Sequence, residues 1–170
     1  VVNFFKKKNI KSFSTWDDVK NRRNLYSKIK KNEFKKKIFN ADFIIMSPGI
    51  NLKKTIFYKE LKYNENKIIT DLDLFYLFNP NVKSIILTGT NGKSTACKML
   101  EHILQKKFKV KLGGNIGIPV LDISLKRKPV VIIEASSFQL AYSKFLKPDI
   151  AAILNITNDH LDWHGTFKNY

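Results

Sequence analysis

A glycine-rich stretch between an apolar run and a helical pattern constrains this chain more than any other feature. Residues 84–87 are mostly apolar, and Thr88-Gly89-Thr90-Asn91-Gly92-Lys93-Ser94-Thr95 follows them directly. Phosphate oxygens need several convergent N–H donors, which a glycine-containing loop at a helix N-terminus provides. We therefore expect a strand, loop and helix that bind the phosphates of ATP. The expected ATP-binding residues are Gly89, Thr90, Asn91, Gly92, Lys93, Ser94 and Thr95.

Two side chains of this loop have expected roles. Lys93 would reach the β- and γ-phosphates, and the Ser94 hydroxyl would contact Mg²⁺. The usual pattern has a glycine five residues before the second glycine, and Leu87 stands there, so the loop is a variant. A chance Gly-Lys-Ser in a turn is the alternative, but the flanking strand and helix favour a phosphate site.

Short apolar runs alternate with helical patterns in the second half of the chain. Runs that are apolar on both faces and separated by helices predict a parallel sheet covered on both sides. The expected strands are 84–87, 110–112, 130–133 and 150–154, and the expected helices are 94–107, 118–125 and 137–144.

The first half is lysine-dense, and its charge-rich residues 20–37 are most simply a solvated helix face or loop. Short strands are expected at 41–46 and 68–70, followed by a helix at 71–78 capped by Asp71. A proline at residue 80 breaks that helix, so we place a domain boundary there.

Polar residues follow several of the expected strands, at the sheet edge where ligands bind in α/β proteins. Glu134 ends an apolar run and is a candidate Mg²⁺ ligand, although an ordinary strand-end acid is the alternative. His160 follows the last strand and is a candidate metal or phosphate contact, against a simple polar turn. Asn115 lies in a Gly-Gly-Asn-Ile-Gly turn, which alone indicates no more than a tight turn.

The formal charge of +17 admits two interpretations, a nucleic-acid binder or a lysine-rich composition. The chain has only three arginines, the residue preferred for phosphate and base recognition, which favours composition bias. No apolar run is long enough to span a membrane. Cys97 is the single cysteine and cannot form an internal disulfide, which fits a reducing cytoplasm.

Four segments occur in one order and together resemble the Mur ligases. They are the phosphate loop 88–95, Gly-Gly-Asn-Ile-Gly-Ile-Pro at 113–119, Glu-Ala-Ser-Ser-Phe-Gln-Leu at 134–140 and Leu-Asn-Ile-Thr-Asn-Asp-His-Leu-Asp-Trp-His-Gly at 154–165. The resemblance implies an α/β fold. A truncated Rossmann-like domain at 1–80 would bind a UDP substrate, and part of a P-loop NTPase-like, parallel-sheet ATPase domain would occupy 81–170.

Within the family, the resemblance points to the branch that adds D-glutamate to UDP-N-acetylmuramoyl-L-alanine in peptidoglycan precursor synthesis. It implies an ATP-dependent amide ligase acting through an acyl phosphate, with ATP and two Mg²⁺ ions. The partners would be small-molecule substrates, with no membrane or nucleic acid, and the protein a cytoplasmic monomer. The implied catalytic residues are Lys93, Glu134 and His160, the metal ligands Ser94, Glu134 and His160, and the substrate contacts Ser47, Pro48, Gly49, Asn115 and Ser136.

Two departures from the family pattern are Asn158, where proline is usual, and Trp163, where arginine is common; neither is a ligand position. The resemblance also implies an internal piece. The first strand would precede Val1, while a carbamylated lysine and a C-terminal domain that holds D-glutamate would follow Tyr170. We expect no ligase activity from this piece alone. The alternatives are a folylpolyglutamate synthase-like ligase and a P-loop NTPase that binds nucleic acid.

Overall fold

The computed structural model describes residues 1–19, 21–23 and 29–170. The chain divides into two compact units, Val1–Ile69 and Thr70–Tyr170. The division therefore lies before the helix at 71–78, whereas the sequence suggested a boundary at residue 80. Of the charge-rich stretch 20–37, residues 20 and 24–28 lie outside the described residues. Within the described part of the chain, no helix is long and apolar enough to cross a bilayer.

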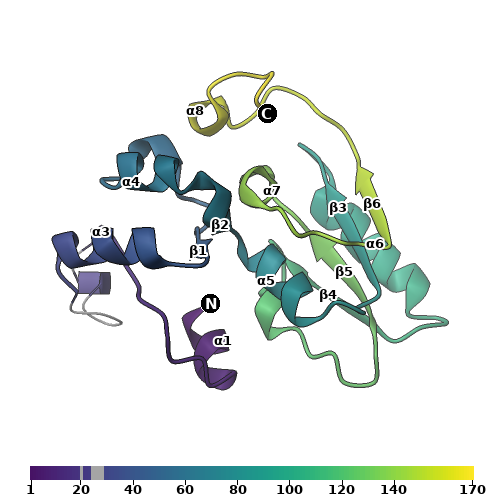
Figure 1. The fold of residues 1–170 in the computed structure, drawn as a ribbon. Helices are drawn as coiled ribbons and strands as arrows, with labels where there is room; N and C mark the ends of the chain where they lie inside the picture. Colours follow the sequence, from purple (N-terminus) through teal and green to yellow (C-terminus); the bar gives the residue numbers. More distant parts are fainter. Residues whose placement is uncertain (20, 24–28) are drawn as a thin grey trace. The chain divides into compact units, whose positions relative to one another are not determined.

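The first unit contains short helices and a two-stranded parallel sheet (Figure 1). The strands pair Ile44 with Ile68 and Ile45 with Ile69, and the Met46 amide donates to the Ile69 carbonyl. Both expected strands are present but short, because the next helix begins two residues after Ile69. The elements are α1 (Val2–Lys7), α3 (Lys31–Asn40), β1 (Ile44–Ile45), η1 (Leu52–Lys54), α4 (Tyr58–Tyr63), η2 (Glu65–Lys67) and β2 (Ile68–Ile69).

The second unit is a four-stranded, all-parallel sheet in the order β4-β5-β3-β6. This confirms the predicted α/β fold class with a parallel sheet. The central position of β3 places the loop that follows it between the ends of β5 and β6. The elements are α5 (Asp71–Phe78), β3 (Ser84–Thr88), α6 (Lys93–Leu104), β4 (Val110–Gly114), η3 (Val120–Asp122), β5 (Val130–Glu134), α7 (Ser137–Tyr142), β6 (Ile150–Ile153) and α8 (Leu161–His164).

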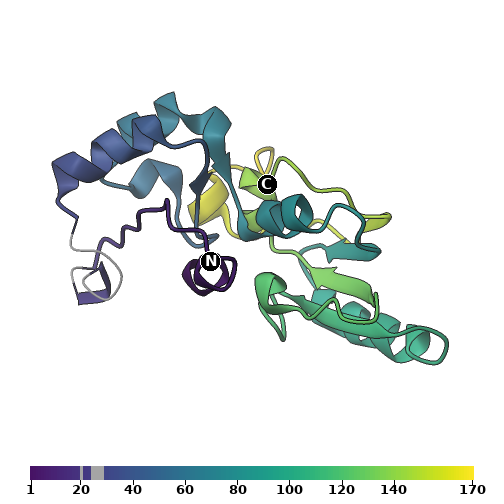
Figure 2. The ribbon, with the colours of Figure 1, turned by 60° about the horizontal axis from the view of Figure 1, so that its bottom comes forward.

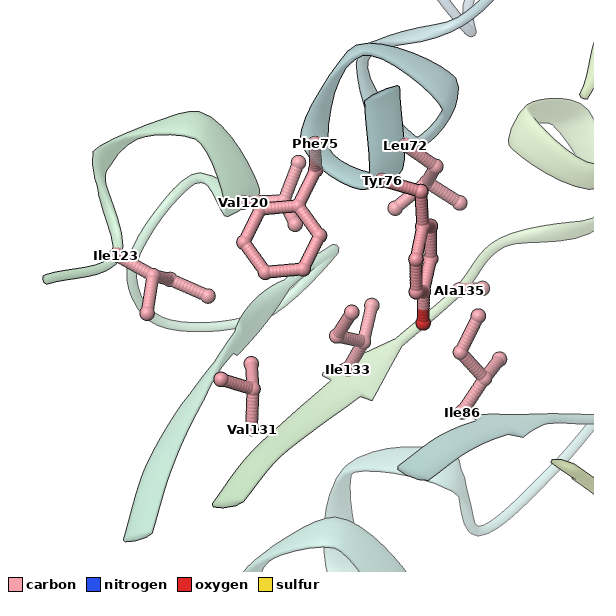
Figure 3. Packing of buried hydrophobic residues seen from close by; sticks show 9 residues of the cluster. All are labelled: Leu72, Phe75, Tyr76, Ile86, Val120, Ile123, Val131, Ile133 and Ala135. Atoms are coloured by element: carbon pink, nitrogen blue, oxygen red, sulfur yellow. The ribbon is translucent and has the colours of Figure 1, made fainter. Parts of the chain in front are cut away.

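Helices cover both faces of this sheet, with α5 on one face and α6 on the other (Figure 2). Alternation along β5 explains this, because successive side chains of a strand point to opposite faces. Val131 and Ile133 pack with Phe75 and Tyr76 of α5, as Figure 3 shows, whereas Ile132 packs with residues of α6. The expectation of a sheet covered on both sides is confirmed.

A buried carboxylate fixes α5 to the second unit. The Asp73 carboxylate accepts hydrogen bonds from the backbone amides of Thr70, Lys144 and Phe145, at 2.8, 2.7 and 2.6 Å. Thr70, not Asp71, is the N-cap of α5, so the predicted cap was wrong by one residue. Asp71 instead accepts a hydrogen bond from the Gln139 side chain of α7. These bonds explain why α5 belongs with the sheet that follows it.

The expected helix at 118–125 was wrong, because only the 3₁₀ turn η3 forms there. Ile118 lies extended beside β4, where its carbonyl accepts from the Gly114 amide, and this pairing excludes a helical conformation. Val120 and Ile123 then turn into the core. The apolar residues whose spacing indicated a helix therefore have other roles, Ile118 in a β-bridge and Val120 and Ile123 in the core.

Candidate functional site

The glycine-rich loop joins the carboxyl end of β3 to the first turn of α6, as the sequence predicted. Gly89 has φ +146° and Gly92, the N-cap of α6, has φ +78°. Residues with a side chain rarely adopt either conformation, so both turns need glycine. The first N–H groups of α6 have no partners within the helix, and the helix dipole makes its N-terminus partly positive. The loop therefore has the local geometry of an anion site.

Lys93 lies across this loop. Its Nζ donates to the carbonyls of Gly89 and Thr90, at 2.6 and 2.9 Å. These contacts hold the ammonium charge over the loop backbone instead of leaving it mobile in solvent. A phosphate on the loop would thus meet a positive charge that is already positioned.

Glu134 brings together three of the predicted site residues. Its side chain lies at the carboxyl end of β5 and is only 2% exposed. One carboxylate oxygen accepts from the Ser94 hydroxyl at 2.8 Å, and the other accepts from the Asn115 side-chain amide at 3.0 Å. These two hydrogen bonds offset the free-energy cost of burying the carboxylate. The ends of β4 and β5 and the start of α6 therefore meet at one carboxylate.

This arrangement fits Mg²⁺, which prefers oxygen ligands in octahedral geometry. The Ser94 hydroxyl and the Glu134 carboxylate are hydrogen-bonded to each other at 2.8 Å, so two oxygen donors lie together beside the phosphate loop. They are the residues that would hold the ion, together with oxygens of the nucleotide and water.

The glycines of the 113–117 turn allow Asn115 to reach Glu134. A Cβ on Gly114, which has φ +104°, would lie 2.4 Å from the Glu134 carbonyl oxygen. A Cβ on Gly113 would lie 2.4 Å from the Ile118 carbonyl oxygen. With glycine at 114, the Asn115 amide donates to the Glu134 carbonyl at 2.8 Å. The turn is thus a close backbone approach, which the sequence alone did not distinguish from an ordinary tight turn.

Three residues beyond β6 bind the phosphate loop, although no sequence pattern assigned them a role. The Asn155 side chain makes two hydrogen bonds with the backbone of Asn91. The backbone carbonyl of Asn155 accepts a third from the Thr90 amide. The Thr90 hydroxyl accepts from the Thr157 amide and pairs with the Tyr170 hydroxyl at 2.8 Å. Only the adjacency of β3 and β6 reveals these contacts, because the partners lie far apart in the sequence.

The structure does not place His160 in a metal cluster. Its ring lies 4.6 Å from that of Phe138 and its Nε2 lies 3.5 Å from the Asp159 carboxylate. Among the described residues, no group of three or more His, Cys, Asp or Glu side chains could hold a metal ion. Any metal bound through Glu134 or His160 would therefore need further ligands from a nucleotide, substrate or water.

A second histidine follows one turn later. His164 Nε2 forms a 2.9 Å hydrogen bond with the Ser137 hydroxyl. Burial, reinforced by the nearby His160, lowers the pKa of His164 below its usual value, while Asp162 acts in the opposite direction. The ring is therefore neutral at neutral pH, as a hydrogen-bonded and partly buried imidazole should be.

The predicted substrate contacts lie in three different settings. Ser136 is the N-cap of α7, and its hydroxyl accepts from the Gln139 amide at 3.3 Å, so it has a structural role in the fold. Asn115 binds Glu134, as described above. Ser47, Pro48 and Gly49 belong to the first unit, in a turn after β1 that the bond from the Ile50 amide to the Ser47 carbonyl closes.

Comparison with known proteins agrees with this geometry. The model of the Mur ligase middle domain matches residues 87–170, the span that contains the loop, Glu134 and His160. A UDP-N-acetylmuramoylalanine–D-glutamate ligase from Buchnera aphidicola subsp. Schizaphis graminum is 43% identical over 95% of this chain. The chain belongs to the Mur ligase family. The sequence resemblance to these ligases is confirmed.

The chain matches only part of the length of its relatives. The ligase of the same name from Wolbachia pipientis wMel is 38% identical over 91% of this chain. The chain covers 38% of the Buchnera relative and 32% of the Wolbachia relative, so it spans about a third of their length. A crystal structure of MurF from Acinetobacter baumannii has a TM-score of 0.45 at 23% identity, over 58% of this chain and 24% of that one.

Proposed function

We propose that this chain binds ATP with Mg²⁺ and is the ATP-binding part of an amide ligase that adds D-glutamate to UDP-N-acetylmuramoyl-L-alanine. The observation that carries the proposal is the meeting of Ser94, Glu134 and Asn115 beside the loop that holds Lys93. A loop for phosphate and an oxygen pair for Mg²⁺ are the parts that phosphoryl transfer requires. The names of the relatives support the choice of substrates.

In this proposal, the γ-phosphoryl group of ATP passes to the L-alanine carboxylate, so that ADP leaves and an acyl phosphate forms. The D-glutamate amine then displaces phosphate, and an amide forms. The difficulty is to bring two anions together, and the Lys93 ammonium lowers that barrier by neutralising charge on the transferred group. Mg²⁺, when bound by Ser94 and Glu134, would neutralise further phosphate charge. No enzyme nucleophile is required.

The remaining residues take supporting roles in the proposal. Asn115 holds the Glu134 carboxylate with one amide hydrogen and has a carbonyl oxygen to offer a substrate donor. His160 is the candidate for a second Mg²⁺, with its other ligands supplied by substrate. Ser47, Pro48 and Gly49 would line the uridine-diphosphate site, and Ser136 would shape the substrate site through the α7 N-terminus it caps.

A ligase assay tests the proposal in the protein translated from the whole reading frame that contains these residues. ATP, Mg²⁺, UDP-N-acetylmuramoyl-L-alanine and radiolabelled D-glutamate should give labelled nucleotide product, and K93A should abolish it. L-glutamate with a folate, and salt-dependent DNA binding, are the control arms. Product from the folate pair alone, tight DNA capture without ligation, or full turnover by K93A would each refute the proposal.

A further inference from the structure

We propose that Asn155 is a positioning residue that fixes the phosphate loop in its ATP-binding conformation. The inference rests on the proposed nucleotide binding and assigns a role to a residue outside the loop. Asn155 lies two residues after the end of β6, and β6 pairs with β3, the strand that leads into the loop. The sheet therefore delivers this side chain to the loop from the neighbouring strand.

The Asn155 carboxamide pairs with the Asn91 backbone as a second peptide group would. The Asn91 amide donates to Asn155 Oδ1 at 2.9 Å, and Asn155 Nδ2 donates to the Asn91 carbonyl at 2.9 Å. A two-point pairing fixes both the position and the orientation of the Asn91 peptide units. Only a side chain with one donor and one acceptor side by side can make it.

Contacts of the two residues before Asn91 show that the loop lies directly on the segment after β6. The Thr90 amide donates to the Asn155 carbonyl at 3.0 Å. A Cβ on Gly89 would lie 3.1 Å from that carbonyl oxygen and 3.2 Å from the Asn155 nitrogen. Gly89 therefore permits the approach that lets Asn155 reach Asn91.

These bonds divide the loop into two parts. The amides of Thr90 and Asn91 bind Asn155, so they anchor the loop and are not the amides that receive phosphate. The phosphate donors are then the amides at the start of α6, from Gly92 to Thr95. The loop contains two glycines, which cost the most entropy to order. A clamp that orders them before ATP arrives increases affinity by removing that cost from binding.

The experiment compares N155A with the unchanged 170-residue chain. Amide hydrogen exchange by NMR reports the clamp, because only the Asn91 amide loses its acceptor in N155A. The Thr90 amide is the internal reference, since it binds the backbone carbonyl that alanine retains. Calorimetric titration with ATP and Mg²⁺ gives the affinity, and thermal unfolding reports the fold. N158A is the matched control, because Asn158 is an exposed asparagine of the same segment.

In N155A we expect faster exchange at Asn91 but not at Thr90, and about tenfold weaker ATP binding. The unfolding temperature should fall by no more than a few degrees, because Asn91 and Asn155 are exposed and water can replace the lost partners. N158A should match the unchanged chain in all three. Unaltered exchange at Asn91, or faster exchange with unaltered affinity, would overturn the positioning role. If the unchanged chain binds no ATP, the proposed function fails, and exchange at Asn91 alone then decides whether the clamp exists. Should N155A not fold, N155S replaces it, because serine is neutral and lacks the paired amide donor and acceptor, and the same outcomes support or overturn the role.

Discussion

Replacing Gly114 by alanine tests the close approach that holds Asn115 against Glu134. The new Cβ would lie 2.4 Å from the Glu134 carbonyl oxygen, whereas ordinary contact begins at 3.4 Å. The end of β4 must therefore move away from β5 by about 1 Å, the difference between these two distances. That movement would break two hydrogen bonds of Asn115, one to the Glu134 carbonyl and one to its carboxylate.

The expected cost follows from these contacts. A side chain at φ +104° is strained by about 1–3 kcal/mol. The lost backbone bond is worth about 1 kcal/mol and the bond to the carboxylate about 2 kcal/mol. We expect G114A to lower the free energy of unfolding by about 4–6 kcal/mol, a large part of the stability of an ordinary domain.

Gly117 in the same turn provides the matched control. Its φ is +69°, and the nearest atom to an added Cβ, the Leu112 carbonyl oxygen, is 3.7 Å away. G117A should therefore cost only the left-handed strain, about 1–2 kcal/mol. Urea unfolding followed by circular dichroism measures both variants. Equal losses in G114A and G117A would refute the reasoning, because they would mean that the approach to Glu134 carries no energetic weight.

Three further predictions concern single ionisable side chains. E134Q should raise the Mg²⁺ concentration needed for half-maximal ATP binding by at least about tenfold with little change in stability, because the Ser94 hydroxyl can turn to accept from the new amide; an unchanged Mg²⁺ titration would remove Glu134 from the metal ligands. Because the pKa of His164 is lowered from 6.5, the unfolded chain binds more protons in mild acid, so the free energy of unfolding should fall as the pH drops below 6.5. Urea titrations at several pH values should give a shallower fall for H164Q than for the unchanged chain, and identical slopes would contradict the assignment. Burial raises the pKa of the Cys97 thiol to about 11, so iodoacetamide should label it slowly at neutral pH until urea unfolds the chain, and rapid labelling of the folded chain would contradict that burial.

The sequence predicted elements well where one local pattern had one structural meaning. The run at 130–133 is apolar and β-branched throughout, and it forms β5 at the centre of the sheet. The helical spacing after Lys93 became α6, with Cys97 against the sheet. The prediction around Ile118 failed because apolar spacing looks the same in a helix and in a segment that pairs with a strand.

The candidate site divides in the same way. Gly92 and Lys93 could be found from the sequence because the loop is continuous along the chain and its chemistry depends on local backbone conformation. The clamp by Asn155 could not, because it lies 64 residues from Asn91 and depends on β6 being the neighbour of β3. Strand order is a property of the assembled sheet, and apolar runs alone do not specify it.

The membership of α5 in the second unit has a practical consequence for anyone who wishes to study the sheet by itself. A recombinant product that started at residue 81 would omit Leu72, Phe75 and Tyr76, which cover Ile86, Val131 and Ile133. It would also remove the Asp73 carboxylate that receives the Lys144 and Phe145 amides. Such a product would expose the apolar face of the sheet and leave the Lys144 and Phe145 amides without their acceptor. It would therefore aggregate. A product that starts at Thr70 retains α5, its apolar contacts with the sheet and the hydrogen bonds of Asp73.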